Sequence, residues 1–408
     1  MSTEIIHESA TLKGAASDYW SRVKAGDIGA LPAILGLVAL CAIFGAMSDV
    51  FLTAGNFANL LTQAAAVIVI AMGLVFVLLL GEIDLSAGYA AGVSGAVLVI
   101  LITNHQVAWY IAFPISIMVG ALLGFILGSL VARIGIPSFV VTLAAFLAFQ
   151  GLLLLLAGEG GTIRIEDKTI LAVENSNLSP LLSWVFFIVV AVAYVGTGLN
   201  RLNTRRRAGL KTELVKLWVI KTASLLLITG GAVFALTVER SNNPDLVSLK
   251  GIPYVVPLIL FLLAVGTFVL GRTAFGRHIY AVGGNAEAAR RAGINVKRVR
   301  ISAFVICSSL AAVAGMIFAS RQNSISPTTG GSSTLLYAVG AAVIGGTSLF
   351  GGKGKMRDAI LGGLVVAVID NGMGLLGYAA GIKFIVTGLV LLVSAGVDAV
   401  SRRGSSVS

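Results

Sequence analysis

The side chains best suited to chemistry in this chain are polar groups that interrupt long apolar runs. Glu82, Asp84 and Ser86 lie between two glycines in the segment 81–89, GEIDLSAGY, directly after such a run. If the run crosses a membrane, carboxylates there mark a pathway, a gate or a proton site. Polar side chains can bond backbone groups that glycine frees, so we predict a broken helix or short re-entrant turn near a translocation path. An extended segment would place the three side chains on one side. The alternative is a plain cytoplasmic turn with solvated carboxylates.

A second set of polar residues is divided between two other apolar runs. Asp370 and Asn371 interrupt one run. Asn56, Asn59 and Gln63 have the spacing i, i+3, i+7 at the start of another, which places them on one helix face. Because a carboxylate inside a membrane must pair with another group or face water, Asp370 forms either an interhelical hydrogen bond or part of a transport path. Helix capping and anchoring at the membrane surface explain the amides as well as contact with a substrate does.

The polar segment 273–300 is the third region of interest. Asn285 can cap a short helix over 286–292, and Gly293 can end it. An acidic residue in the first turn and two arginines in the last turn suit the helix dipole. This helix either faces solvent and lipid headgroups or docks on a cytoplasmic partner. The residues of the docking surface would be Gly284, Asn285, Glu287, Ala288, Arg290, Arg291 and Gly293.

Catalysis is not expected of this chain. It lacks a Gly-x-Ser-x-Gly elbow, a His-Glu-x-x-His motif and a Cys–His pairing. The stretch 345–356 superficially resembles a phosphate-binding loop, but Thr347 occupies the place of its first glycine, and Gly354 follows Lys353 where Ser or Thr is required. The chain therefore has no evident ATP site, and an ATP-driven process would need a separate nucleotide-binding subunit.

Composition places these residues in a membrane protein. Of the 408 residues, 57% are apolar and only 12% are charged, and the mean hydropathy is +0.97. A soluble chain of this length needs polar surface that this sequence lacks. Disordered chains and disulfide scaffolds do not fit this composition either. The three histidines lie far apart without metal-ligand spacing, so no metal site is expected.

The apolar runs predict an all-α, polytopic transmembrane helix bundle with about twelve spans. Each crossing needs about 20 mostly apolar residues, and the runs lack the alternation of a β-barrel. The predicted spans are 29–47, 57–80, 87–103, 109–131, 138–157, 181–198, 214–238, 253–270, 301–319, 335–350, 359–377 and 384–400.

Lysine and arginine indicate the orientation, because cytoplasmic loops carry an excess of both. With the N- and C-termini in the cytoplasm, inner segments hold 21 of these residues and outer segments hold 6. The same distribution explains the net charge of +11 without nucleic acid as a partner. We expect a cytoplasmic N-terminal segment at 1–28, a transmembrane domain at 29–400 with an inner loop at 271–300, and a cytoplasmic tail at 401–408.

One helix face is built from glycine. Gly120, Gly124 and Gly128 recur every four residues along the fourth predicted span. Three bare patches on one face let a second backbone approach closely. We expect this face to pack within the bundle; the alternatives are a pore lining and a contact between subunits.

Five motifs together resemble the membrane permease subunits of bacterial monosaccharide ATP-binding-cassette (ABC) importers, the ribose/xylose group. The motifs are GEIDLSAG (81–88), PSFVVTLAAFLAFQG (137–151), TAFGRHIYAVGGNAEAARRAGIN (273–295), VIGGTSLFGG (343–352) and IDNGMGL (369–375). The resemblance covers residues from about 29 to 400. It is closest to the xylose branch, through Glu82 and through two spans at 199–245 that add to a family core of ten.

The resemblance implies a multi-pass inner-membrane protein that translocates a monosaccharide, xylose or another pentose, and hydrolyses nothing itself. It implies a homodimer in the lipid bilayer, a cytoplasmic ATP-binding subunit that holds ATP and Mg, and a periplasmic sugar-binding protein. The helix at 286–292 would then be the coupling helix that docks on the ATPase. The rival hypothesis is an ion-coupled secondary sugar transporter in which Glu82, Asp84 and Asp370 carry protons or sodium.

Overall fold

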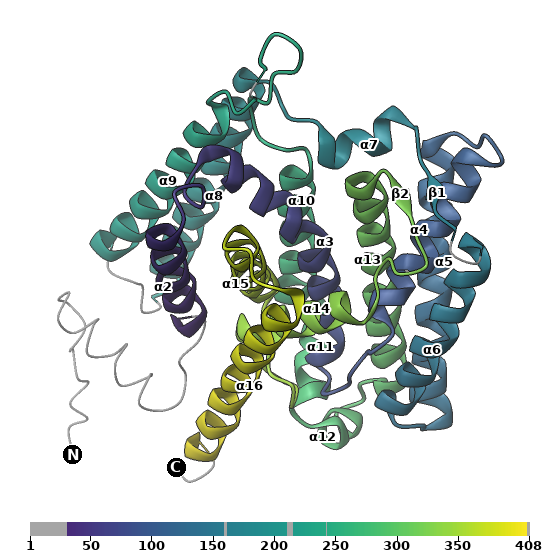
Figure 1. Ribbon diagram of the computed structural model, residues 1–408. Coiled ribbons are helices and arrows are strands. Elements are labelled where there is room, and N and C mark those ends of the chain that lie inside the picture. The colour runs from purple at the N-terminus through teal and green to yellow at the C-terminus, as the bar shows by residue number, and fades with distance from the viewer. Residues whose placement is uncertain (1–30, 159–160, 210–214, 242, 406–408) are drawn as a thin grey trace, which may run out of the picture. The chain divides into compact units, whose positions relative to one another are not determined.

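The computed structural model describes residues 31–158, 161–209, 215–241 and 243–405, and this part of the chain is almost entirely helical (Figure 1). The helices are α2 (Leu31–Met47), α3 (Ala54–Leu78), α4 (Ala87–Thr103), α5 (Trp109–Ser129), η1 (Leu130–Ile134, a π-helical turn), α6 (Ser138–Ala157), α7 (Lys168–Asn175), α8 (Pro180–Arg207), α9 (Val215–Thr237), α10 (Val255–Arg272), α11 (Ala274–Gly284), α12 (Ala286–Arg291), α13 (Val296–Gln322), α14 (Ser332–Ile344), α15 (Met356–Leu375) and α16 (Ala380–Ser405). Two short strands, β1 (Ile163–Arg164) and β2 (Ser324–Ile325), pair antiparallel.

Each of the twelve predicted apolar runs contains a helix, so the all-α membrane architecture is confirmed, although the run 335–350 is helical only as far as Ile344. In the described part of the chain, eight helices are long and apolar enough to cross a bilayer. The shorter apolar helices are Leu31–Met47, Ala87–Thr103, Ser333–Ile344 and Ala380–Gly396. The count of twelve spans, the cytoplasmic termini and the domain limits stay predictions, and residues 1–30 and 406–408 lie outside the described part of the chain.

The chain divides into two compact units, of which the smaller is built on Asn177–Ile252. In it, α8 and α9 pack against each other, and the Trp218 ring covers Gly198. Most apolar side chains of α8 are exposed, as expected of a helix that faces lipid. In the connection after α9, the carboxylate of Glu239 accepts hydrogen bonds from nearby backbone amides and lies 3.6 Å from the Lys250 amino group.

The larger unit contains Gly29–Ser176 and Pro253–Ala399, and α3, α4, α13 and α15 contribute most of its buried core. α3 is apolar on all sides over most of its length, which is typical of a helix surrounded by others. α13 packs against α3, α4 and α5. Figure 1 shows α7 and α12 at opposite ends of this unit, near the two ends of α13.

The glycine face predicted on the fourth span joins α5 to α13. A Cβ at Gly120 or Gly124 would collide with backbone carbonyls of α13, and one at Gly128 would lie 2.8 Å from the Ile301 Cα. Only a bare backbone allows this close approach. The prediction that this face packs inside the bundle is confirmed.

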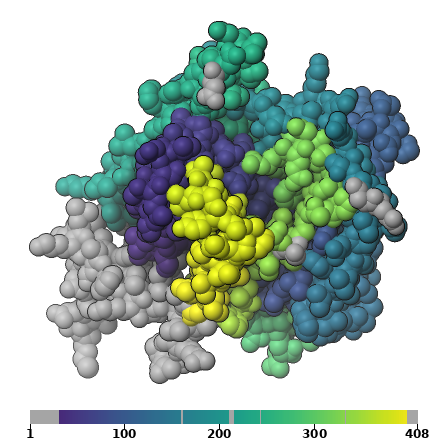
Figure 2. Space-filling model, in the orientation of Figure 1, coloured from purple at the N-terminus to yellow at the C-terminus, as the bar shows by residue number. Residues whose placement is uncertain are grey.

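α16 lies on the surface of the larger unit in the face drawn in Figure 2, where it is coloured yellow. Its side chains Phe384, Ile385 and Leu392 are more than half exposed. The Phe384 ring also packs against the ring of Tyr337 on α14. Exposed apolar side chains on a span suit contact with lipid tails.

Two helices lie in connections that the sequence analysis treated as loops. The Asp167 side chain caps α7 by accepting hydrogen bonds from the backbone N of Thr169 and of Ile170, both at 2.9 Å. The Thr273 hydroxyl caps α11 by accepting from the Gly276 N at 3.1 Å. Both residue types are favoured N-caps, so this signal was available in the sequence.

Candidate functional site

The segment between α3 and α4 forms the predicted interruption. After α3 ends, Gly81 takes a left-handed conformation (φ +73°), and α4 begins at Ala87. Asp84 is fully buried, and its Oδ1 accepts hydrogen bonds from the backbone N and the Oγ of Ser86 at 2.9 and 2.6 Å. A bond of this kind closes a turn, so the solvated-carboxylate interpretation is wrong for Asp84. Ser86 is helical (φ −94°, ψ −12°), so the alternation of an extended segment does not apply.

The remaining carboxylate of this segment connects the break to other helices. The Glu82 Oε1 lies 3.1 Å from the Nε of Arg300, in the first turns of α13. The next residue is held to α6, because the Ile83 N donates to the Ser138 Oγ and the Ile83 O accepts from the Thr142 Oγ1, each at 3.2 Å. The break between α3 and α4 is therefore fixed by hydrogen bonds to α6 and by an ion pair to α13.

The turn after α3 also contacts α11 and the loop between α14 and α15. The Gly352 N donates to the Leu79 O at 2.9 Å. Gly283 of α11 lies so close to the same carbonyl that a Cβ at this position would collide with it. The Tyr280 hydroxyl donates to the Gly354 O at 2.8 Å. Through these contacts α11 packs directly against the break between α3 and α4, and α12 follows α11 along the chain.

α12 has the local structure that the sequence predicts. The Asn285 Oδ1 accepts from the Ala288 N at 2.9 Å, and Gly293 has the positive φ (+83°) of a residue that ends a helix. Glu287 pairs with both arginines of the last turn at 3.2 and 3.5 Å, and all three side chains are more than half exposed. The helix is one residue shorter than predicted, Ala286–Arg291. Its role in docking, and the roles of Gly284 and the other residues assigned to that surface, stay predictions.

A polar cluster of five residues lies between α3, α15 and α16. Asn56 and Asn371 exchange two hydrogen bonds between their amides, each at 2.9 Å. The Gln63 Nε2 donates to the Asp370 Oδ2 at 2.6 Å, and the Lys383 amino group lies 3.6 Å from the Asp370 Oδ1. Asp370 thus forms the interhelical hydrogen bond that the sequence analysis considered, and it is also ion-paired. The polar cluster satisfies a carboxylate within the helix bundle.

Asn59 faces a cation instead of the polar cluster. Arg321, near the end of α13, donates from Nη1 to the Thr62 Oγ1 at 2.9 Å and from Nη2 to the Asn59 Oδ1 at 3.4 Å. Arg321 and Lys383 were not among the predicted site residues, because in the charge pattern both count only as cations in outer connections. An isolated cation at the end of an apolar run was the signal that could have found them.

The candidate residues form two groups, one at each end of α3. Asn59, Gln63, Asp370 and Asn371 belong to the first end, whereas the break with its buried carboxylate follows the last turn. From Gln63 to the end of the helix α3 rises about 22 Å. The two groups therefore do not form one binding site within this unit.

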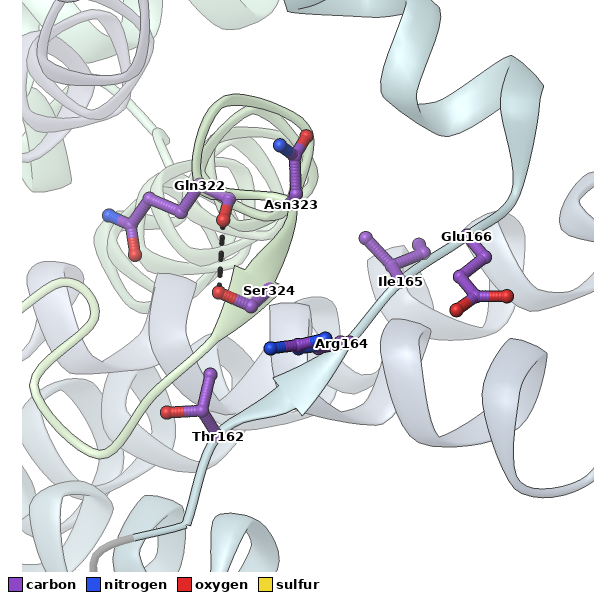
Figure 3. Close-up of a pocket in the computed structure, with 7 residues that line it drawn as sticks. All are labelled: Thr162, Arg164, Ile165, Glu166, Gln322, Asn323 and Ser324. Atoms are coloured by element: carbon purple, nitrogen blue, oxygen red, sulfur yellow. Dashed lines mark hydrogen bonds between the residues drawn. The ribbon is translucent and has the colours of Figure 1, made fainter.

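A polar pocket with a volume of about 520 Å³ lies where β1 pairs with β2, beyond the end of α13 (Figure 3). Its lining residues are Thr162, Arg164, Ile165, Glu166, Gln322, Asn323 and Ser324. The Ser324 Oγ donates to the Gln322 O at 3.0 Å. Among the residues that the structure describes, no group of three or more His, Cys, Asp or Glu side chains could hold a metal ion.

The known proteins that this chain resembles are all transport permeases. Residues 56–395 match the family described as the permease component of branched-chain amino acid transport systems. The chain is 35% identical over 394 residues to the xylose transport system permease protein XylH of Escherichia coli K12, covering 95% of this chain and 96% of that protein. The Haemophilus influenzae XylH is 32% identical over 375 residues, 91% of this chain and 96% of the relative. The ribose import permease protein RbsC of E. coli K12 is 28% identical over 365 residues, 90% and 92% of the two chains. No solved structure matches this chain.

Proposed function

This chain belongs to the ABC-importer permease family that includes the xylose and ribose permeases compared above, and we propose that it carries a pentose, with xylose as the first candidate, across the bacterial inner membrane. As a family member it is a membrane-spanning transport subunit for sugar import and not an enzyme by itself. The observation that carries the choice of sugar is the 35% identity to a xylose permease over 95% of the chain, against 28% to a ribose permease over 90%.

The polar groups of the bundle suit a neutral, hydroxyl-rich substrate. Such a sugar needs hydrogen-bonding side chains along its path and no fixed charge to grip it. In the polar cluster, the carboxylate of Asp370 is already bonded by an amide and an ammonium group. We assign Asn59, Gln63, Asp370 and Asn371 to the outer end of the path, and the break at 82–86, with Glu82, Asp84 and Ser86, to its inner gate.

We propose that ATP hydrolysis by a partner subunit is coupled to transport through α12. We assign the docking of a cytoplasmic ATP-binding subunit, which holds ATP and Mg, to this helix and its flanking glycines. The exposed arginines of α12 can contact a partner directly. From α12, the contact of Gly283 with the Leu79 carbonyl leads to the break. A rigid, closely packed connection of this kind can transmit a displacement, because packed interiors are hard to compress.

We propose two further partners. A periplasmic sugar-binding protein would deliver the sugar at the outer face, and a second copy of this chain would complete the path as a homodimer. With specificity set by the receptor, the permease itself needs only weak contacts with the sugar. This division of tasks agrees with a path whose amides are available to hydroxyl groups, while its carboxylates are already engaged by other groups of the protein.

The rival function, ion-coupled secondary transport, would use Glu82, Asp84 and Asp370 as carriers. Two of these carboxylates are ion-paired, with Arg300 and Lys383, and the third closes a turn. An ion carrier must exchange its ligands with water on both sides, which these contacts oppose. The structural contacts therefore favour the ATP-driven reading.

Reconstitution distinguishes the two functions. The chain should import xylose into proteoliposomes only with its ATP-binding subunit, its receptor and ATP, and a sodium or proton gradient should not replace ATP. Receptor calorimetry with xylose, ribose and glucose then identifies the sugar. Accumulation of sugar by this chain alone, driven by an ion gradient, would refute the proposal.

A variant in α12 tests the docking assignment. Glu287→Arg replaces an acid that pairs with two arginines and creates a cluster of three cations. We expect normal membrane insertion and normal ATP hydrolysis by the partner, with sugar uptake reduced at least tenfold. Unchanged uptake would remove α12 from the coupling route.

A further inference from the structure

Glu174 is a buried acid that the proposed transport path does not use. It lies in α7, on the connection that the charge distribution places outside the membrane. Its side chain is only 7% exposed, and neither carboxyl oxygen has a hydrogen-bond partner among the residues that the structure describes. A buried ionised carboxylate without donors is strongly unfavourable. This position therefore requires either a proton or a cation that can move toward it.

α7 is held on the end of α13 by a small set of hydrogen bonds. The Ser320 Oγ accepts from the Glu174 N at 2.9 Å and donates to the Leu171 O at 3.0 Å. The Asn175 Nδ2 donates to the Ser320 O and to the Asn323 Oδ1, both at 2.9 Å. These bonds fix the backbone of α7 at Glu174, so its carboxyl group cannot turn to solvent while α7 stays docked.

Arg321 is the charged group of α13 that acts on this carboxyl group. Burial raises the pKa of Glu174 to about 8, and the positive charge of Arg321 opposes that rise. The charged residues of α7 itself, Asp167 and Lys168, lie at the other end of the helix, where Asp167 is engaged as the N-cap. Tyr254, whose N bonds the Ser176 O beyond the end of α7, is partly exposed.

We propose that Glu174 is a proton-binding site under α7 and that its protonation decides whether Arg321 contacts α3 or α7. With a neutral Glu174, Arg321 is free to donate to Thr62 and Asn59 on α3. An ionised Glu174 lacks other donors and draws the guanidinium toward itself. The bond to Asn59, at 3.4 Å the longer of the two, is the first to break.

The proposal makes Glu174 a positioning residue for the outer end of the transport path, and in this respect it rests on the proposed function. Asn59 is assigned to that path, and Arg321 orients it. The external pH would then set the fraction of molecules in which Arg321 is hydrogen-bonded to Asn59. Because the neutral form of Glu174 is favoured in the docked state, docking is strongest at low pH and weakens as the pH rises toward 8. Between an ordinary glutamate pKa and 8, each pH unit lowers the ratio of docked to undocked α7 by up to tenfold.

Transport by the complete complex tests this proposal. Proteoliposomes would hold the inner pH constant while the outer pH is varied from 6 to 9. We expect wild-type uptake to fall with a midpoint near pH 8 and the Glu174→Gln variant, which is permanently neutral, to lose this dependence. Glu166→Gln, an exposed acid on the same connection, is the matched control and should keep the wild-type midpoint. Identical pH profiles of Glu174→Gln and wild type would overturn the proposal.

A second measurement separates this proposal from the proposed function. Hydrogen–deuterium exchange of α7 amides in the purified chain, corrected for intrinsic pH effects, reports docking without any transport assay. Protection of α7 should fall about tenfold between pH 7 and 9 in wild type and stay constant in Glu174→Gln. Equal protection in both proteins refutes the proton site, whereas absent uptake with the expected exchange pattern refutes only the transport function.

Discussion

Exchanging the charges of the Glu82–Arg300 ion pair is the most direct test of the inner gate. The pair joins the break after α3 to the first turns of α13, with Nε and Oε1 3.1 Å apart. The side chains are 13% and 30% exposed, so solvent screens them only in part. Glu82→Arg and Arg300→Glu each place two like charges at this position, and the double variant restores an opposite pair in reversed order.

The coupling energy of the Glu82–Arg300 pair follows from the distance between the two charges and from their burial. At an effective dielectric constant of about 20, two unit charges at this distance attract by about 5 kcal/mol before the cost of desolvation. Desolvation removes more than half of that gain in a partly buried pair, which leaves about 2 kcal/mol. This coupling energy corresponds to a roughly 30-fold change in an equilibrium constant. If the closed state of the gate depends on this ion pair, loss of the pair should change the ratio of closed to open gates by that factor.

The assay is the number of ATP molecules hydrolysed per sugar imported by the complete complex. Each single reversal should raise this number at least tenfold, and the double variant should return to within about threefold of wild type. Arg298→Glu, an exposed reversal two residues away on the same turn of α13, controls for the change in charge alone. A double variant no better than the worse single variant would refute the role of the pair.

Two further variants test individual contacts. Asp370→Asn should lower the free energy of unfolding in detergent by about 2 kcal/mol, because the Lys383 charge stays behind unpaired. Adding Lys383→Met should recover most of that loss. Equal thermal stability of the single and double variants would contradict this expectation. Gly283→Ala should reduce uptake by the assembled complex severalfold or prevent its assembly, because the added methyl group collides with a backbone carbonyl of the turn after α3. Gly271→Ala on α10, where an added methyl group would meet no described atom within 4 Å, should behave as wild type. Equal loss of uptake in the two glycine variants would contradict the role of the Gly283 contact.

Local signals in the sequence located the apolar helices and α12, whereas α7 and α11 were taken for loops. Hydropathy located every apolar helix, because about 20 apolar residues in one run have few alternatives to a span. Flanking glycines located the interruption at 81–89, and Asn285 and Gly293 located α12 to within one residue. The glycine face of α5 was assigned correctly to packing, since bare patches at every fourth residue are useful only against another backbone.

The side-chain partners were decided by the tertiary structure alone. Gln63 and Asp370 are 307 positions apart, and nothing in either helix encodes how it is rotated against the other. In α3, apolar residues surround the helix, so no face stands out by periodicity. The burial of Asp84 and the contact of Asn59 with Arg321 depend in the same way on how α13 packs. The sequence therefore determined which segments are helices and where they break, and packing determined which polar groups meet, because helix rotation and register are set by contacts between segments distant in the chain.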